Sequence, residues 1–143
     1  MKNIFLAAVL LVMSLTGQAS DCSPQKPEPF DSFLKNFSSA QDFALKRTVF
    51  PLRMLKWEFG LDEQGKDVSA PEKWAISRGE YDGWPTLSEA LKENKQLTSR
   101  VGSITAAKVV LEVFQPNTDW LVLFHFRTQK GCWFFWQYED RSL

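Results

Sequence analysis

The sequence predicts a single α+β domain, in which two or three N-terminal and central helices pack on one face of a curved antiparallel sheet. Three observations favour this class. Apolar residues recur at helical spacing in residues 30–47, a capping box opens a further helix at Thr86, and residues 104–138 show the patterns of strands. Helices that precede or interrupt a group of strands, without alternating with each strand, are typical of α+β domains.

The first two helices follow from spacing. Four apolar residues lie at positions i, i+3, i+4 and i+7 of a short helix: Phe30, Phe33, Leu34 and Phe37. Pro29 suits the first turn of this helix. Ser39 and Asp42 resemble a capping box, so a second helix is expected from about Ala40 to Arg47.

The middle of the chain predicts two strands and a third helix. Residues 55–59 alternate apolar and polar side chains, which indicates a half-buried strand, and residues 74–76 form a shorter one. Residues 79–85 are expected to be a loop. The Thr86–Glu89 capping box then opens a helix that ends near Leu97.

The last third predicts strands over residues 104–114, 119–127 and 132–138, the last two joined by a hairpin at 128–131. Gly131 favours a three-residue loop with a bulge, which would place Phe126 opposite Phe134. One face would then hold Trp120, Val122, Phe124, Phe126, Phe134, Trp136 and Tyr138. The mixed face would hold Leu121, Leu123, His125, Arg127, Trp133, Phe135, Gln137 and Glu139. A two-residue turn would re-pair these sets.

Residues 1–19 have the pattern of a secretory signal peptide. Lys2 supplies a charge, residues 4–13 are almost all apolar, and small residues precede a cleavage point after Ala19. The alternative is a membrane anchor, but the run is shorter than the roughly 18 apolar residues that a span needs. The expected organisation is a signal peptide at 1–19, an extended proline-rich lead-in at 20–29 and one domain at 30–143. We therefore expect a periplasmic or secreted protein without a membrane span after processing.

Cys22 and Cys132 are the only cysteines in the sequence. In an oxidising compartment they are expected to form one disulfide that ties the mature N-terminus to the C-terminal hairpin. Because Cys22 follows the cleavage site closely, lipid attachment is the alternative, although Asp21 stands where a small residue is usual.

The composition narrows the classes of partner and cofactor. The 17 basic and 17 acidic residues balance without a basic run, which argues against a nucleic-acid partner. Residues 62–67 do not match a calcium loop, and a single histidine with a cysteine pair cannot build a typical zinc site. We expect no cofactor and no metal. A protein or a small apolar molecule is the expected partner, and a homodimer is a further option.

Two side chains attract a functional interpretation. His125 is the only histidine, and in a strand between two phenylalanines it has either a structural role or an acid–base role with Asp140 or Glu139. Arg47 ends the second helix. It either stabilises that helix end, paired with Asp140 or Glu139, or binds an anion at the mouth of a cleft.

The chain also resembles a family of small exported bacterial proteins classed as a domain of unknown function. The resemblance rests on Phe33, Phe37, Asp42-Phe43, Arg47 and Phe50-Pro51-Leu52, and on Phe124-x-Phe126, Gly131-x-Trp133, Asp140 and Ser142. It implies the cone-shaped, cystatin-like fold of nuclear transport factor two, scytalone dehydratase and ketosteroid isomerase. This fold hosts catalysts and binding proteins alike, and the acidic base and tyrosine of the isomerases have no counterpart here.

Three functions remain open at this stage. The favoured one is an exported non-enzymatic binding protein, of which one version is an immunity-type protein that binds and blocks a toxin. Its expected binding residues are Arg47, His125, Trp133, Phe135, Gln137 and Glu139. The alternatives are a small hydrolase, isomerase or dehydratase that uses His125 with a carboxylate, and a structural envelope protein. An enzyme needs His125 near a carboxylate and open to a cavity, whereas a binding protein needs an exposed aromatic patch.

Overall fold

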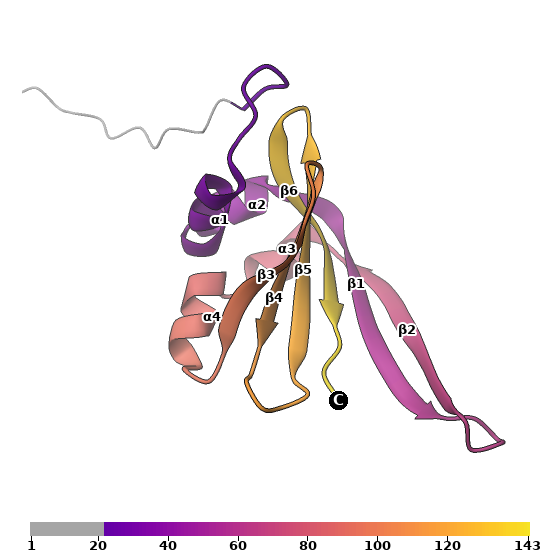
Figure 1. Ribbon diagram of the computed structural model, residues 1–143. Coiled ribbons are helices and arrows are strands. Elements are labelled where there is room, and N and C mark those ends of the chain that lie inside the picture. Colours follow the sequence, from indigo (N-terminus) through magenta and orange to yellow (C-terminus); the bar gives the residue numbers. More distant parts are fainter. Residues whose placement is uncertain (1–21) are drawn as a thin grey trace, which may run out of the picture.

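The computed structural model describes residues 22–143 of the chain (Figure 1). The predicted signal peptide at residues 1–19 lies outside the described residues. The helices are α1 (Phe30–Ser39), α2 (Gln41–Lys46), α3 (Arg78–Asp82) and α4 (Leu87–Glu93). The strands are β1 (Thr48–Leu61), β2 (Asp67–Ile76), β3 (Thr98–Ile104), β4 (Lys108–Phe114), β5 (Leu121–Gln129) and β6 (Cys132–Asp140).

The six strands form one curved sheet in the order β2-β1-β6-β5-β4-β3, and helices α1, α2 and α4 lie over one of its faces (Figure 1). We call the face that carries the helices the inner face and the opposite one the outer face. The α+β prediction is confirmed. The sheet is antiparallel except where β1 runs parallel to β6, with Thr48 opposite Phe135 and Lys56 opposite Asp140.

Capping explains where the two short central helices begin. Thr86 accepts a hydrogen bond from the Glu89 amide while the Glu89 carboxylate accepts one from the Thr86 amide, so the predicted capping box of α4 is confirmed. Ser77 and Glu80 form a second box that opens α3. The prediction of a loop over residues 79–85 was therefore wrong, and the Ser77-x-x-Glu80 spacing is the signal that would have found this helix.

The core between the inner face and the helices is aromatic. Phe126 has no exposed surface, and its ring centroid lies 5.2–5.5 Å from those of Phe30, Phe33, Phe37 and Phe135. The helical stripe supplies three of these rings, and strands β5 and β6 supply the others. Burial of such large side chains and their edge-to-face contacts favour this packing. This cluster fixes α1 over the middle of the sheet.

The hairpin between β5 and β6 differs from the predicted one. Gln129 is opposite Cys132, so the turn is the two-residue Lys130-Gly131, and both turn residues have positive φ (51° and 82°). Such φ values fit the tight turns of twisted hairpins. The register shifts further along, between His125 and Phe126, where Trp136 is the extra residue of β6. Phe126 therefore faces Phe135, not Phe134, so the predicted faces were wrong for residues 133–136 and are confirmed for the β5 residues and for residues 137–139.

The β1–β2 ribbon, residues 57–71, projects beyond the rest of the sheet (Figure 1). Lys56 is the last residue of β1 with a partner in β6, so the remainder of β1 pairs only with β2. Because a ribbon of two strands has little to pack against, several of its apolar side chains are exposed: Phe59, Leu61 and Val68.

Candidate functional site

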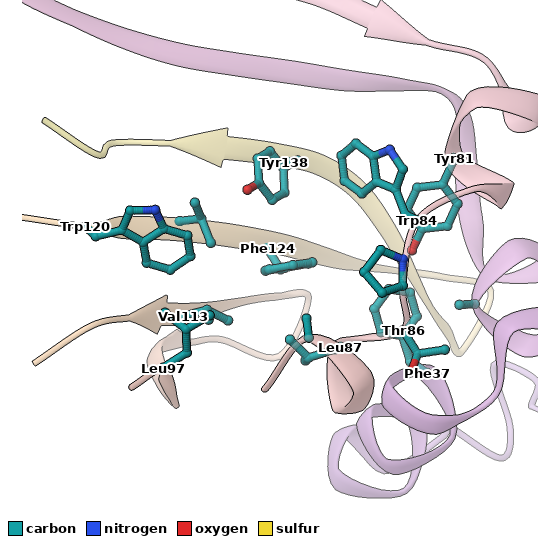
Figure 2. A pocket seen from close by; sticks show the side chains of 14 residues that line it. Phe37, Tyr81, Trp84, Thr86, Leu87, Leu97, Val113, Trp120, Phe124 and Tyr138 are labelled. Atoms are coloured by element: carbon teal, nitrogen blue, oxygen red, sulfur yellow. The ribbon is translucent and has the colours of Figure 1, made fainter. Parts of the chain in front are cut away.

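The inner face carries an apolar cavity of about 240 Å³ beside the aromatic core. It lies between the helices and the inner face of β4, β5 and β6, where Phe124 and Tyr138 are only half-buried. Figure 2 shows side chains from both layers around this space. The lining residues are Phe37, Ala44, Tyr81, Trp84, Pro85, Thr86, Leu87, Ala90, Leu97, Val113, Trp120, Val122, Phe124 and Tyr138.

Aromatic rings set the shape of the cavity wall. Trp84 packs edge-on against Tyr138 with 5.5 Å between ring centroids, and Tyr138 packs edge-on against Phe124 at 5.3 Å. These rings come from the α3–α4 loop, β6 and β5, so they connect the helical layer to the sheet. Mutual contacts of this kind restrict rotation of the rings and therefore favour a preformed cavity.

The ionisable groups of the lining are two tyrosines. Burial raises the pKa of Tyr81 to about 12, and a hydrogen bond with Thr48 opposes this rise only in part. Burial also raises the pKa of Tyr138 well above its usual value of 10.0, and the nearby Asp140 carboxylate adds to the effect. Both hydroxyls are neutral at physiological pH. The cavity therefore offers neutral polar groups and no charged group to a ligand.

His125 belongs to a different place, the outer face of the sheet. Its Nε2 lies 2.7 Å from Oε2 of Glu139, whose other oxygen accepts a 2.6 Å hydrogen bond from Trp57 Nε1 and one from Arg141. Burial lowers the pKa of His125, and although the Glu139 carboxylate opposes this change, the net direction is downward. Burial would raise the pKa of Glu139, but hydrogen bonds from Arg141, Trp57 and His125 lower it overall. At neutral pH a neutral imidazole therefore donates to an ionised carboxylate.

The predicted binding residues separate into three locations. His125, Gln137 and Glu139 lie together on the outer face. Trp133 and Phe135 lie in the core, 6% and 0% exposed, because the register places them on the inner face. Their expected surface position was wrong. Arg47 lies at the end of the sheet next to the N-terminal segment. Sequence reasoning missed the cavity, because its lining comes from segments whose juxtaposition depends on the β1–β6 pairing.

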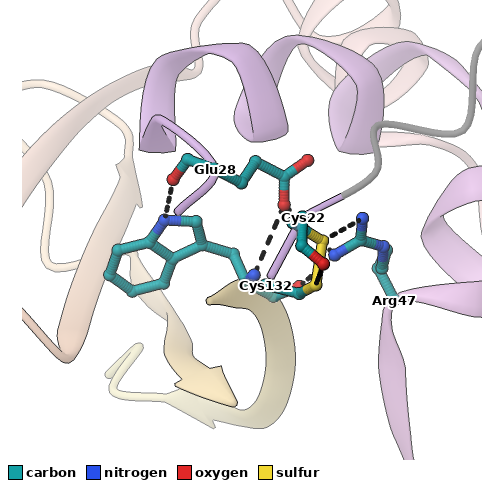
Figure 3. Close-up of polar contacts among 5 residues, drawn as sticks. Cys22, Glu28, Arg47 and Cys132 are labelled. Atoms are coloured by element: carbon teal, nitrogen blue, oxygen red, sulfur yellow. Dashed lines mark hydrogen bonds and ion pairs between the residues drawn. A yellow bond between two sulfur atoms is a disulfide. The ribbon is translucent and has the colours of Figure 1, made fainter. Parts of the chain in front are cut away.

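The Cys22–Cys132 disulfide is confirmed, and it stands beside Arg47 (Figure 3). The Arg47 guanidinium donates to Oε2 of Glu28 at 3.1 Å, to the Trp133 carbonyl at 3.2 Å and toward Sγ of Cys22 at 3.1 Å. The predicted pairing of Arg47 with Glu139 or Asp140 was wrong. Thr48 is opposite Phe135, so Arg47 lies several residues along β6 from both carboxylates.

The lead-in before α1 is held by the same group of contacts. It is not extended throughout, since Ser23 and Lys26 exchange two backbone hydrogen bonds around a turn. The Glu28 amide donates to the Gly131 carbonyl at 2.9 Å, and Trp133 Nε1 donates to the Glu28 carbonyl at 2.9 Å. The segment is thereby attached to the β5–β6 hairpin on both sides of the disulfide.

Metal-binding clusters and membrane-spanning helices are both absent from residues 22–143. No group of three or more histidine, cysteine, aspartate or glutamate side chains there has the arrangement of a metal site. None of the helices in the described part of the chain has the length and hydropathy of a membrane span.

Known structures resemble this fold. An NTF2-like protein from Bacteroides fragilis aligns with a TM-score of 0.53 and 13% identity over 82% of this chain. This chain spans about half of that protein, 49% of its length. A cystatin-like protein from Bacteroides caccae aligns with a TM-score of 0.53 and 22% identity. The alignment covers 80% of this chain and 77% of that protein. A protein from Bacteroides uniformis aligns with a TM-score of 0.50 and 20% identity. The alignment covers 81% of this chain and 77% of that protein.

These likenesses show that the chain has the curved-sheet fold of NTF2-like and cystatin-like proteins, as its resemblance implied. Sequence identities of 13–22% show a common fold only, so the function must be argued from the residues of this chain. No protein-family model matches the sequence. No curated protein matches it either.

Proposed function

We propose that this is an exported binding protein without a catalytic role, and that its cavity holds a small, neutral and mostly apolar molecule. The observation that carries the proposal is the lining of the 240 Å³ cavity, in which aromatic and aliphatic side chains surround two neutral tyrosine hydroxyls. Pockets of this composition, with a few polar groups that orient the ligand, are typical small-molecule sites.

The volume and polarity of the cavity define the ligand class. An engineered cavity of about 150 Å³ in another protein accepts benzene, so a cavity of 240 Å³ suits a somewhat larger molecule with one or two rings. A charged ligand would lose its hydration without meeting an opposite charge, which opposes its binding. A single hydroxyl or carbonyl on the ligand would find a partner in Tyr138, whose hydroxyl points into the space between Trp120 and Phe124 (Figure 2).

A pair of dyes tests this proposal on the protein lacking residues 1–19. N-phenyl-1-naphthylamine is neutral, and 8-anilinonaphthalene-1-sulfonate has nearly the same ring system with a negative charge. We expect the neutral dye to bind with enhanced fluorescence. A larger residue in the cavity wall, Ala90→Leu, should weaken its binding at least tenfold, since Ala90 lines the cavity from α4.

Ala75→Leu is the matched control, because Ala75 is an exposed residue of edge strand β2 and does not line the cavity. It should leave binding of the neutral dye unchanged. Equal binding of that dye to both variants, or tighter binding of the charged dye at the site blocked by Ala90→Leu, would contradict the proposal.

Export is supported by the order of charge, apolar run and small residues in positions 1–19, and by the Cys22–Cys132 disulfide, which is typical of oxidising compartments. Intact-mass measurement of the protein from the periplasmic fraction should give a chain that starts at Ser20, without a lipid. Recovery of the full-length chain from the cytoplasm would contradict this part of the proposal.

An enzyme would need His125 both near a carboxylate and open to a cavity, and the structure has only the first of these. His125 is within hydrogen-bond reach of the Glu139 carboxylate. However, neither residue lines the cavity, and both lie on the opposite face of the sheet. His125→Gln keeps hydrogen-bonding capacity and removes the titration, so it should leave dye binding unchanged. A substrate whose turnover falls about 100-fold or more in this variant would favour the enzyme instead.

A second candidate gives the binding role to a protein partner, as in an immunity-type protein that blocks a toxin. The observation in its favour is the β1–β2 ribbon, where Phe59 and Leu61 are 52% and 66% exposed. Cells that lack the gene should be outcompeted by sister cells that keep it, and a copy without residues 1–19 should fail to restore them. Equal growth in co-culture would exclude this candidate.

A further inference from the structure

The outer face of the sheet carries more basic than acidic side chains, although the whole chain has a formal net charge of zero. Residues opposite one another in the register share a face, which places the following side chains on the outer one. The basic ones are Arg53, Lys73, Arg100, Lys108, Arg127 and Arg141, and the acidic ones are Asp67, Glu112 and Glu139. This face therefore has an excess of three positive charges, which the remainder of the molecule balances.

Trp136 is the centre of this face. The guanidinium carbons of Arg53 and Arg127 lie 5.3 and 5.2 Å from the centroid of its ring, and the His125 ring approaches it edge-on at 6.2 Å. Trp136 is here because it is the extra residue at the irregularity of β6, which directs it to the same side as Gln137. Stacking on an indole holds a guanidinium in place while its N–H groups stay available to an acceptor.

The two arginines at Trp136 differ from the other arginines of the outer face. Arg100 and Arg141 have ion pairs with Glu112 and Glu139. Among residues 22–143, by contrast, no carboxylate forms an ion pair with Arg53 or Arg127. The Gln129 amide, with its oxygen toward Arg127, lies 2.9 Å from Nη2 and 3.1 Å from Nε, which orients this guanidinium without neutralising it.

An apolar groove of about 390 Å³ adjoins the charged area. Its lining residues are Phe59, Phe114, Trp120, Leu121 and Leu143, the polar Thr118, and the charged Arg100, Arg141 and Asp119. Arg100 is stacked over Phe114 with 4.7 Å between its guanidinium carbon and the ring centroid. The outer face thus combines fixed arginines, a tryptophan and an apolar groove, which is the composition of protein interaction hot spots.

We propose that the outer face binds an acidic segment of a partner protein, with carboxylates on Arg53 and Arg127 and a bulky apolar side chain in the adjoining groove. The planar guanidinium fork matches a carboxylate in a bidentate manner. Preorganisation by Trp136 reduces the entropy that each arginine loses on binding. This site is separate from the cavity, so it does not depend on the small-molecule proposal.

Two other anionic partners fit the same charge less well. Single-stranded nucleic acid binds by stacking its bases on open aromatic faces, and here two guanidiniums occupy positions over the Trp136 ring. A membrane surface would need exposed apolar side chains close to the charges, whereas Trp136 is half-buried and the exposed Phe59 lies six residues along β1 from Arg53.

The test uses two synthetic peptides and records the indole N–H signals of the protein by NMR. The acidic peptide Ac-GEEDLFEDEG-NH2 has the proposed chemistry, and Ac-GQQNLFQNQG-NH2 replaces each carboxylate by an amide. Trp136→Phe identifies the Trp136 signal. We expect the acidic peptide to shift that signal in a saturable manner, more weakly at 300 mM than at 50 mM salt, and the amide peptide to bind at least tenfold more weakly.

The double variant Arg53→Gln/Arg127→Gln should weaken binding of the acidic peptide at least tenfold. Lys35→Gln/Lys92→Gln removes the same charge from exposed positions of α1 and α4 on the helical side, and it should bind as the parent does. Equal loss in both variants, or binding of the two peptides with the same affinity, would overturn the proposal. So would binding of oligo-dT or of phosphatidylglycerol vesicles that depends on Arg53 and Arg127 while the acidic peptide does not bind.

Discussion

Glu28 and Arg47 form an ion pair with 3.1 Å between Oε2 and Nη1, and their side chains are only 2% and 12% exposed. The guanidinium also lies over the rings of Phe43 and Phe134, at 5.1 and 5.5 Å from their centroids. This arginine therefore connects the lead-in, α2 and β6. Its role in the fold is clear from these contacts, whereas a role in binding an anion stays a prediction.

Arg47→Ala should lower the free energy of unfolding by about 3 kcal/mol, because it leaves the Glu28 carboxylate buried without its partner. Urea denaturation provides the measurement. Arg100→Ala is the control, since it removes an ion pair whose arginine is 66% exposed, and such pairs contribute at most about 1 kcal/mol. Similar losses of unfolding free energy in the two variants would show that burial of the Glu28–Arg47 pair does not add to stability.

The Cys22–Cys132 disulfide should contribute to the free energy of unfolding about as much as Arg47 does. Cys22 and Cys132 are separated by 110 residues in sequence, so the crosslink restricts the unfolded chain strongly. We expect Cys22→Ser/Cys132→Ser to lower the stability by roughly 2 to 5 kcal/mol. The unfolding midpoint of the parent should fall by the same amount under reducing conditions, whereas the midpoint of the variant should not respond to reductant. A parent protein that is insensitive to reductant would refute this prediction.

His125 should make the protein less stable in mild acid. Its pKa in the folded state is below the usual 6.5, because burial disfavours the charged imidazole. As the pH falls through 6.5, the unfolded chain takes up a proton that the folded chain does not, so the stability falls until the pH reaches the folded pKa. His125→Gln should therefore lose less stability than the parent between pH 7.5 and 5.5. Parallel curves of stability against pH would mean that His125 does not carry this dependence.

Substitution of Gly131 should lower the stability for two reasons, its positive φ and the close approach of Ser23. A matched pair of variants separates these two effects. Its φ is 82°, and a Cβ built on it would lie 2.0 Å from the Ser23 carbonyl oxygen. Gly65 has a similar φ of 75° but nothing within 4 Å of such a Cβ. Gly65→Ala should cost about 1 kcal/mol for the backbone alone, and Gly131→Ala about 2 kcal/mol more. Calorimetric melting should resolve the difference, and equal losses would mean that the lead-in moves away freely.

Local patterns predicted the helices of this fold better than its strand pairing. The stripe that includes Phe33 and Phe37 and the capping box at Thr86 act within one or two turns, so they can be read from neighbouring residues. The register of the last hairpin could not be read in this way. Gly131 suits both a two-residue turn and a three-residue loop with a bulge, so the residues of the turn leave both registers open.

Prediction of the candidate sites depended even more on contacts between residues that are far apart in the sequence. Trp133 and Phe135 change faces when the register shifts by one residue, so an error in the turn moved two core residues to the predicted surface. The irregularity at Trp136 then brought a residue that was expected on the apolar face to the centre of the charged one. Tertiary pairing, which has no local signal at these positions, decides which aromatic residues are displayed.

The parallel pairing of β1 with β6 also determines when the fold can be completed. β1 joins the other four strands only through β6, which begins at Cys132. A ribosome therefore releases α1, α2 and the first two strands long before the strand that incorporates them exists. Contacts between such distant parts of a chain form late and slowly. A chain that ends before Cys132 should have no stable sheet, and only a chain that includes β6 should resist proteases.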